Sequence, residues 1–354
     1  MRAFLSRIYH SKPYLPIKYQ PSKGVKVELV ENARKHGLRV GLYYNLRDRH
    51  EPGGNSKWGP SQSYVENYML PQMKELIQLY EPVYLWSDGA GHARDDTWHS
   101  QEIVAWYYSW AENHGREVLV NDRWGSNHRI MRVSENKAHG DVWTPEHQTM
   151  KGIVDHKWES AETSQMLPRR SAWAYKPSAE FKSRENVMRV FLDIVSKGGN
   201  LLFNIGPKAD GSIPGPAQQL LLTLGDWLEV NGEAIYGTEP RGNQQQTDAH
   251  KLVFPDWAGG KRKWMWEQVV EEAENEGPVY FTVKGPYTYA IHYGWPGENL
   301  VLHNIVAEPK SAIRMLGVDE NLTWWQRGDD LIIQTPAVQS CDYAYSFKIK
   351  RAQH

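Results

Sequence analysis

Between residues 25 and 235 the sequence alternates between apolar runs typical of buried strands and segments whose apolar residues recur at helical spacing. The predicted strands are 38–46, 83–86, 117–121 and 200–205, and the predicted helices are 25–33, 64–80 (broken or kinked at Pro71), 103–113, 184–197 and 217–230. Strands that alternate with helices of this length form βαβ units and a parallel sheet. Because no glycine-rich phosphate motif follows any of these strands, the α/β pattern favours a (β/α) TIM-type barrel over a doubly wound sheet.

The stretch 126–177 is less regular. Short strand candidates lie there at 142–143, 157–158 and 172–175. A closed barrel needs eight strands, and only about six candidates precede Tyr236. We therefore expect a barrel that lacks its first strands, whose place would be before Val25.

The pattern changes after about Tyr236. The polar stretch 238–250, which contains three consecutive glutamines, is typical of a linker, and short alternating runs follow it at 279–283, 288–293, 299–302, 331–334 and 343–349. Runs at this spacing, bounded by Gly, Pro, Asn and Asp, predict a small antiparallel β-sandwich. The predicted organisation is an atypical N-terminal segment (1–24), a partial catalytic barrel (25–237) and a C-terminal sandwich (238–354).

Composition excludes several function classes. With 41 Lys and Arg against 42 Asp and Glu, the net charge of −1 gives no dominant electrostatic footprint, so neither a nucleic acid nor a membrane is an expected partner. The single cysteine, Cys341, excludes an internal disulfide and a Cys-based zinc site, and the 14 histidines show no zinc-binding pair on a predicted helix. We expect no metal and no cofactor. The 16 Trp and 19 Tyr against 7 Phe suit a sugar-binding cleft, although large cores also use Trp.

Polar side chains at the carboxyl ends of parallel strands are the candidates for chemistry. Asp88 comes directly after the predicted strand 83–86, between Trp86 and Gly89, which would let a ligand approach closely. The alternative for Asp88 is a helix cap or an Asp-Gly turn. Arg123 follows strand 117–121 and could donate to sugar hydroxyls or form a structural ion pair.

Glycoside hydrolysis needs a second carboxyl group to protonate the leaving oxygen. Glu146, which follows Pro145 and lies near Trp143, is one candidate, and Glu159, next to Trp158, is the other. An apolar ring beside either group would favour the protonated form that a general acid needs. Each could equally be a solvated loop glutamate, so the residues alone leave the choice open.

Five segments together resemble the α-L-fucosidases of glycoside hydrolase family 29, most closely the animal tissue (lysosomal) type. They are YEPVYLWSDG (80–89), VLVNDRWG (118–125), DHKWES (155–160), GGNLLFNIGPKADGSIP (198–214) and WLEVNGEAIYGT (227–238). The resemblance implies a retaining exo-hydrolase of terminal α-L-fucose on fucosylated glycans, with a barrel-type catalytic domain and a C-terminal β-sandwich. It implies no cofactor, and since members of the family are often oligomeric, a homo-oligomer is a further expectation.

The resemblance also implies roles for individual residues. Asp88 matches the nucleophile, Arg123 matches an arginine of the fucose pocket, and Trp86 and Tyr43 match pocket walls. Glu146 matches a Thr-x-Glu segment that carries the acid/base in many members, and Glu159 is the alternative. We prefer Glu146; a retaining enzyme should hold the two carboxyl groups about 5–5.5 Å apart.

The chain departs from the family at its N-terminus. The His-Trp-Gly and His-His-Asp/Glu-Gly motifs, whose side chains hold the fucose hydroxyls, do not occur, and 1–24 stands where a much longer segment is expected. Two alternatives to an active enzyme stay open: a catalytically inactive truncated relative that binds fucosylated glycans, and a fragment of a longer enzyme. The family implies a lysosomal or secreted protein, whereas 1–24 lacks the apolar core of a secretory signal and, taken literally, implies a cytoplasmic one.

Overall fold

The computed structural model describes residues 25–48, 51, 53–54, 59–126, 140–150, 152–167, 170–242 and 278–352. The predicted N-terminal segment 1–24 and residues 243–250 of the predicted linker lie outside the described residues. The chain divides into two compact units. The first is Met1–Pro145 with His156–Trp158, and the second is Glu146–Asp155 with Glu159–His354.

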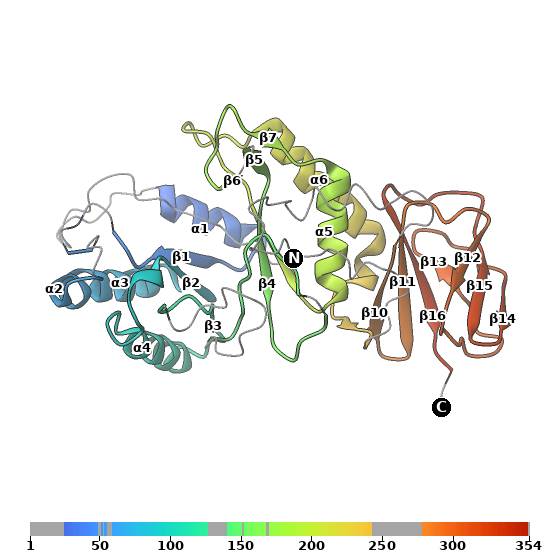
Figure 1. The fold of residues 1–354 in the computed structure, drawn as a ribbon, viewed down its shortest axis with the longest axis horizontal. Coiled ribbons are helices and arrows are strands. Elements are labelled where there is room, and N and C mark those ends of the chain that lie inside the picture. The colour runs from blue at the N-terminus through green and yellow to red at the C-terminus, as the bar shows by residue number, and fades with distance from the viewer. Residues whose placement is uncertain are drawn as a thin grey trace, which may run out of the picture. The chain divides into compact units, whose positions relative to one another are not determined.

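The first unit contains a three-stranded parallel sheet in the order β1-β2-β3. Its strands are β1 (Gly41–Asn45), β2 (Tyr84–Asp88) and β3 (Leu119–Val120), and its helical segments are α1 (Val25–Lys35), α2 (Gln62–Tyr64), η1 (Val65–Met69), α3 (Leu70–Tyr80), η2 (Ala90–His92) and α4 (Ser100–Asn113) (Figure 1). Successive side chains of a strand point to opposite faces. Leu42, Tyr44 and Leu85 therefore enter an apolar core shared with α3 and α4, while Tyr43 and Asp88 lie on the other face of the sheet.

The predicted helix 64–80 changes type before Pro71 rather than ending there. Val65–Met69 form a π turn, in which the N–H of Leu70 donates to the carbonyl of Val65, and α-helical geometry follows from Leu70. Proline has no N–H and is tolerated only in the first turn of an α-helix. Pro71 occupies that first turn of α3, so the helical segment continues past it.

The second unit begins with two parallel strands, β4 (Glu159–Thr163) and β8 (Asn200–Asn204). A small antiparallel sheet, in the order β6-β5-β7, lies between them in the sequence and consists of β5 (Gln165–Leu167), β6 (Arg170–Ala172) and β7 (Glu180–Phe181). The helices are α5 (Arg184–Ser196), α6 (Gly215–Asn231) and η3 (Gly232–Ala234). Helix α5 begins where predicted, because the Ser183 side chain accepts a hydrogen bond from the N–H of Asn186 and caps it.

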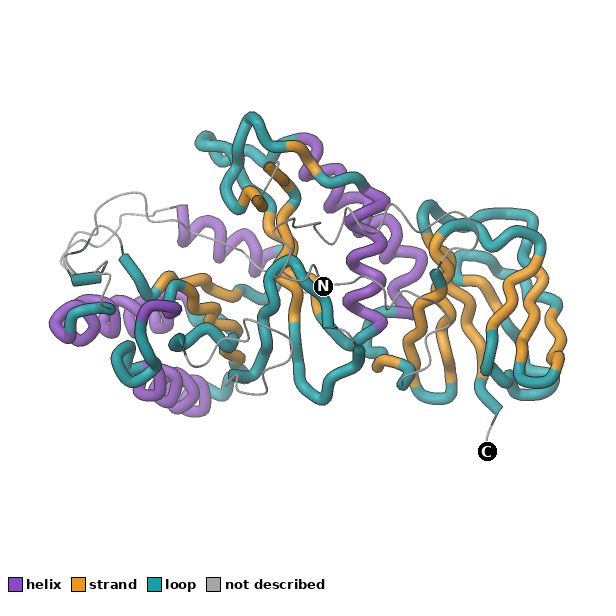
Figure 2. Tube along the Cα trace, in the orientation of Figure 1, coloured by secondary structure: helices purple, strands orange, loops and turns teal. Residues whose placement is uncertain are grey.

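Two antiparallel sheets form the C-terminal part of the second unit, as predicted (Figure 2). The five-stranded sheet has the order β13-β16-β11-β10-β9 and the three-stranded sheet the order β12-β15-β14. Their strands are β9 (Glu239–Pro240), β10 (Val279–Lys284), β11 (Tyr287–Tyr293), β12 (Asn299–Leu302), β13 (Arg314–Met315), β14 (Trp324–Arg327), β15 (Asp330–Gln334) and β16 (Ala344–Lys350). Strand β9 lies within the predicted linker, so the start of that linker belongs to the sheet.

The five-stranded sheet is covered on both faces. Phe281 and Phe347 share an apolar core with Leu302 and Ile333 of the three-stranded sheet. The alternate residues, among them Tyr280, Tyr289 and Ile291, pack against α5 and α6. Alternate residues of these strands therefore point into two different cores, and both faces of the sheet are buried.

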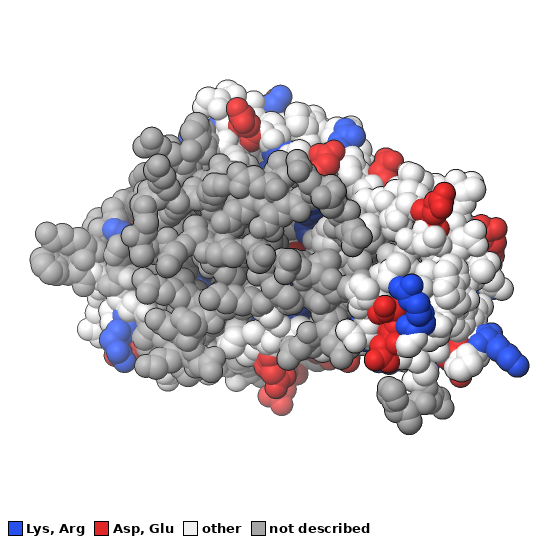
Figure 3. Space-filling model, turned by 45° about the vertical axis from the view of Figure 1, so that its right-hand side comes forward, with Lys and Arg blue, Asp and Glu red and all other residues white. Residues whose placement is uncertain are grey.

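Charged side chains of both signs are interspersed on the described part of the face drawn in Figure 3. This distribution agrees with the near-zero net charge of the sequence. Among the helices of the described ranges, none is long and apolar enough to cross a bilayer.

Candidate functional site

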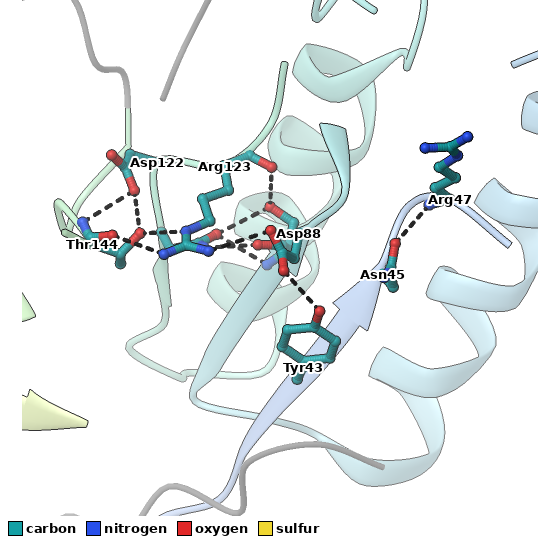
Figure 4. Close-up of polar contacts among 9 residues, drawn as sticks. Tyr43, Asn45, Arg47, Asp88, Asp122, Arg123 and Thr144 are labelled. Carbon is teal, nitrogen blue, oxygen red and sulfur yellow. Dashed lines mark hydrogen bonds and ion pairs between the residues drawn. The ribbon is translucent and has the colours of Figure 1, made fainter. Parts of the chain in front are cut away.

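The Asp88 carboxylate, at the carboxyl end of β2, accepts hydrogen bonds from Tyr43 and Arg123 (Figure 4). The Tyr43 hydroxyl donates to Oδ2 at 2.9 Å, and Nη1 of Arg123 donates to Oδ1 at 3.3 Å. The Asp88 side chain is 25% exposed, whereas that of Arg123 is 3% exposed. The structure therefore brings together three of the predicted site residues around a carboxylate that a ligand could still approach.

Gly89 explains why β2 ends at Asp88. Its φ of +78° lies in the left-handed region, and a Cβ atom at this position would lie 2.2 Å from Oδ1 of Asn45. That oxygen also accepts the N–H of Arg47 at 3.0 Å, so it is held in place (Figure 4). Glycine is the residue that suits this turn. Gly89 precedes η2 as its N-cap residue, while Asp88 remains the last residue of β2 and its carboxylate contacts Tyr43 and Arg123.

The Arg123 guanidinium is fixed by Thr144. Nε donates to the Thr144 hydroxyl and Nη2 to its carbonyl oxygen, both at 2.9 Å. The same hydroxyl donates to Oδ1 of Asp122 at 2.5 Å, and the N–H of Thr144 donates to that atom at 3.1 Å. Thr144 is not among the predicted site residues, although it is the threonine of the Thr-x-Glu segment and directly follows the strand candidate 142–143.

Trp86 contacts both Tyr43 and Arg123. The Arg123 guanidinium lies 4.3 Å from the centre of the Trp86 ring, and the Tyr43 ring stacks on Trp86 with centroids 5.4 Å apart. Cation–π and stacked contacts of this kind favour fixed ring and guanidinium planes. Trp86 itself is only 8% exposed, so its role as a pocket wall stays a prediction.

A buried pair of polar side chains ties β2 to the segment that carries Arg123. The N–H of Ser87 donates to Oδ1 of Asn121 at 3.0 Å, and Nδ2 of Asn121 donates to the Ser87 carbonyl at 2.8 Å. The Ser87 hydroxyl donates to the Arg123 carbonyl at 2.8 Å. These bonds fix the backbone at Ser87 relative to that of residues 121–123. They therefore help to place Asp88, which follows Ser87, next to Arg123.

The two candidate acid/base residues belong to the second unit. Glu146 is half-buried in an irregular segment and forms a parallel β-bridge with Ala161. Glu159 is the first residue of β4 and is 1% exposed. The alternative of a solvated loop glutamate is therefore wrong for Glu159, because it lies in a buried strand. Among the described residues, no group of three His, Cys, Asp or Glu side chains could hold a metal ion.

The contact between Tyr43 and Asp88 gives the first testable expectation. Tyr43→Phe removes the donor to Oδ2, and a hydrogen bond to a charged group contributes about 1.5–3 kcal/mol. For the hydrolysis that the resemblance in the sequence implies, we expect kcat/KM on an aryl α-L-fucoside to fall about 10- to 100-fold. Tyr44→Phe is the matched control, because the Tyr44 hydroxyl donates to Gln72 on the opposite face of the sheet. Equal losses in the two variants would contradict a role for the Tyr43 hydroxyl at Asp88.

Two family models match the chain. The model described as "Alpha-L-fucosidase" matches residues 7–233, and the model described as "Alpha-L-fucosidase C-terminal domain" matches residues 272–350. Tissue alpha-L-fucosidase of Mus musculus is 29% identical over 94% of this chain and 68% of its own length. Plasma alpha-L-fucosidase of Homo sapiens is 32% identical over 86% of the chain and 59% of its own length. The chain thus spans about two thirds of the length of these relatives or somewhat less.

A solved structure supports the same family. The α-fucosidase of Thermotoga maritima, crystallised in complex with fucose, matches with a TM-score of 0.69 and 25% identity. The match covers 94% of this chain and 69% of that one. The similarity therefore extends over both parts of this chain, the α/β part and the antiparallel sheets.

Proposed function

Because the chain belongs to the α-L-fucosidase family, we propose that it is a retaining exo-glycosidase, which hydrolyses terminal α-L-fucose from glycoproteins, glycolipids or oligosaccharides. The observation that carries this proposal is the partly exposed Asp88 carboxylate, which Tyr43 and Arg123 hold at the end of β2. Two donors, one of them positive, suit a carboxylate that must stay ionised until it attacks a sugar.

In the first step an oxygen of Asp88 attacks the anomeric carbon and the glycosidic bond breaks, which leaves fucose covalently bound to the enzyme. We propose that Arg123 contacts both Asp88 and the sugar. Thr144 fixes Nε and Nη2 of its guanidinium, so that Nη1 is directed toward Asp88. Trp86 supports Tyr43 and Arg123 from one side and acts on the sugar mainly through them.

We propose Glu146 as the acid/base. It would donate a proton to the leaving oxygen in the first step and remove one from the attacking water in the second. Functional groups of a parallel α/β fold lie toward the carboxyl ends of its strands. Glu159 is at the amino end of β4, whereas Glu146 pairs with Ala161 further along that strand, which favours Glu146.

The parallel pairings support a barrel-type catalytic domain over 25–237. The order β1-β2-β3 is extended in the first unit by the parallel bridges Asn121–Val142 and Trp143–Trp158. In the second unit Glu146 pairs with Ala161 and β4 pairs with β8, again in parallel. Adjacent parallel pairings of this kind are what a wall of a (β/α) barrel requires. The C-terminal sandwich over 238–354 and the lysosomal or secreted location belong to the same proposal.

The test is hydrolysis of 4-nitrophenyl α-L-fucoside by the purified chain, followed by proton NMR. We expect α-L-fucose as the first product, before it equilibrates with the β-anomer, and no hydrolysis of the matched 4-nitrophenyl β-L-fucoside. β-L-Fucose as the first product would contradict double displacement. Binding of a fucosylated oligosaccharide without hydrolysis would instead support the inactive relative.

A further inference from the structure

The segment that carries Glu146 has no regular secondary structure, yet the three residues after Glu146 are each anchored to buried groups of the same unit. The N–H of His147 donates to the Ala161 carbonyl at 3.1 Å. The Ser160 hydroxyl donates to the carbonyl of Gln148 at 2.8 Å. Nζ of Lys197 lies 3.3 Å from the hydroxyl of Thr149. A general acid needs such support, because it must stay within hydrogen-bond reach of the leaving oxygen.

His147 is the most constrained of the three. Its φ is +55°, in the left-handed region that costs a residue with a side chain about 1–2 kcal/mol. Its Nδ1 lies 3.1 Å from Oε2 of Glu162, and its ring packs on Trp173 with centroids 5.1 Å apart. Strained backbone of this kind persists only where the surroundings hold it, and it clusters at functional sites.

The group that holds His147 is itself a buried ion pair. Nζ of Lys182 lies 2.7 Å from Oε2 of Glu162, and the two side chains are 3% and 1% exposed. Oε2 therefore accepts hydrogen bonds from both His147 and Lys182. The other oxygen, Oε1, accepts a hydrogen bond from the Ser160 hydroxyl at 3.3 Å. A buried carboxylate with these partners is held in place, so it can fix the His147 side chain and, through it, the backbone next to Glu146.

We infer that His147, anchored by the Glu162–Lys182 ion pair, is a positioning residue for the general acid Glu146. This inference rests on the proposed function. The inference goes beyond that function because it assigns the placement of the acid/base to His147 and the buried ion pair.

The expected consequence is specific to substrates that need an acid. An aryl fucoside with a poor leaving group, such as the 4-methoxyphenyl glycoside, depends on protonation of its leaving oxygen, whereas a 2-chloro-4-nitrophenyl fucoside does not. His147→Gly keeps the left-handed backbone accessible but removes the anchor. We expect it to lower the ratio of kcat/KM for the poor substrate to that for the activated one about 10- to 100-fold. Glu146→Ala should lower this ratio further than His147→Gly does.

Two variants serve as controls. In His147→Asn, the amide nitrogen can take the place of Nδ1 and asparagine tolerates the left-handed region, so the ratio should stay within about threefold. In His99→Gly, the same change is made at a half-buried histidine of the first unit, with a φ of +52° and Nδ1 3.3 Å from Oε2 of Glu102, and the ratio should not change.

The ratio is independent of how much of a variant is folded, since both substrates report on the same active molecules. An unchanged ratio in His147→Gly, or equal loss on both substrates, would overturn the positioning role and leave the proposed function intact. If the unsubstituted chain hydrolyses neither substrate, the proposed function and this inference both fail. If Glu146→Ala alone leaves the ratio unchanged, the acid is not Glu146 and the positioning role fails with it.

Discussion

Asp88→Ala is expected to lower kcat for hydrolysis of an aryl α-L-fucoside by about 10³-fold or more, because the variant has no oxygen to form the covalent intermediate. The fold should survive. The Asp88 side chain is 25% exposed, so water can reach the Tyr43 and Arg123 donors that lose their partner. The measurement is kcat of the purified variant together with its midpoint of thermal unfolding.

Azide makes this expectation specific for a nucleophile. A small anion can enter the space that the carboxylate leaves and attack from the same face, so Asp88→Ala with azide should yield β-L-fucosyl azide. Loss of an acid/base would instead yield the α-azide, since azide then attacks the covalent intermediate. The control is Asp96→Ala, which removes an exposed carboxylate of the same unit and should leave kcat within about twofold. Asp88→Ala with more than about a tenth of the original kcat would exclude Asp88 as the nucleophile.

Part of the site could be predicted because its polar residues directly follow apolar runs in the sequence. The runs at 38–46 and 83–86 are strongly apolar, since one face of β1 and β2 packs in the core with α3 and α4. A polar residue such as Asp88 or Arg123 after such a run is conspicuous. The partner contacts could not be predicted. That Tyr43 rather than Tyr44 meets Asp88 depends on the register, which pairs Asn45 with Asp88.

Strand β4 was missed for the opposite reason. Its sequence, ESAET, contains one apolar residue, so it carries no hydrophobic signal, and yet all five residues are buried. Some of its polar side chains have partners that are distant in sequence, as in the bonds from Lys182 to Glu162 and from Ser160 to Gln148. Burial of a polar strand depends on these tertiary contacts. The same holds for His147, which the sequence places in an irregular segment.

Lys182→Met gives the largest expected effect on stability. The substitution leaves the buried Glu162 carboxylate without its closest cation, and breaking a buried pair in this way lowers the free energy of unfolding by about 3–5 kcal/mol. Burial raises the pKa of Glu162, but Lys182 and His147 outweigh it and hold this pKa at about 2, against an ordinary 4.5. In the unsubstituted chain this contribution to stability is therefore fully present above about pH 4.5 and is lost as the pH falls toward 2.

In Lys182→Met the balance at Glu162 shifts toward burial, so the pKa of its carboxyl group rises. The difference in the free energy of unfolding between the two proteins should then shrink as the pH falls from 7 to 3, which denaturant unfolding at a series of pH values would measure.

Glu162→Leu combined with Lys182→Met removes both charges and should recover much of the loss. Lys348→Met breaks the exposed pair with Glu233 and should cost about 1 kcal/mol or less. Equal losses in Lys182→Met and Lys348→Met would show that the buried ion pair does not hold this part of the second unit, and with it the anchor of His147, in place.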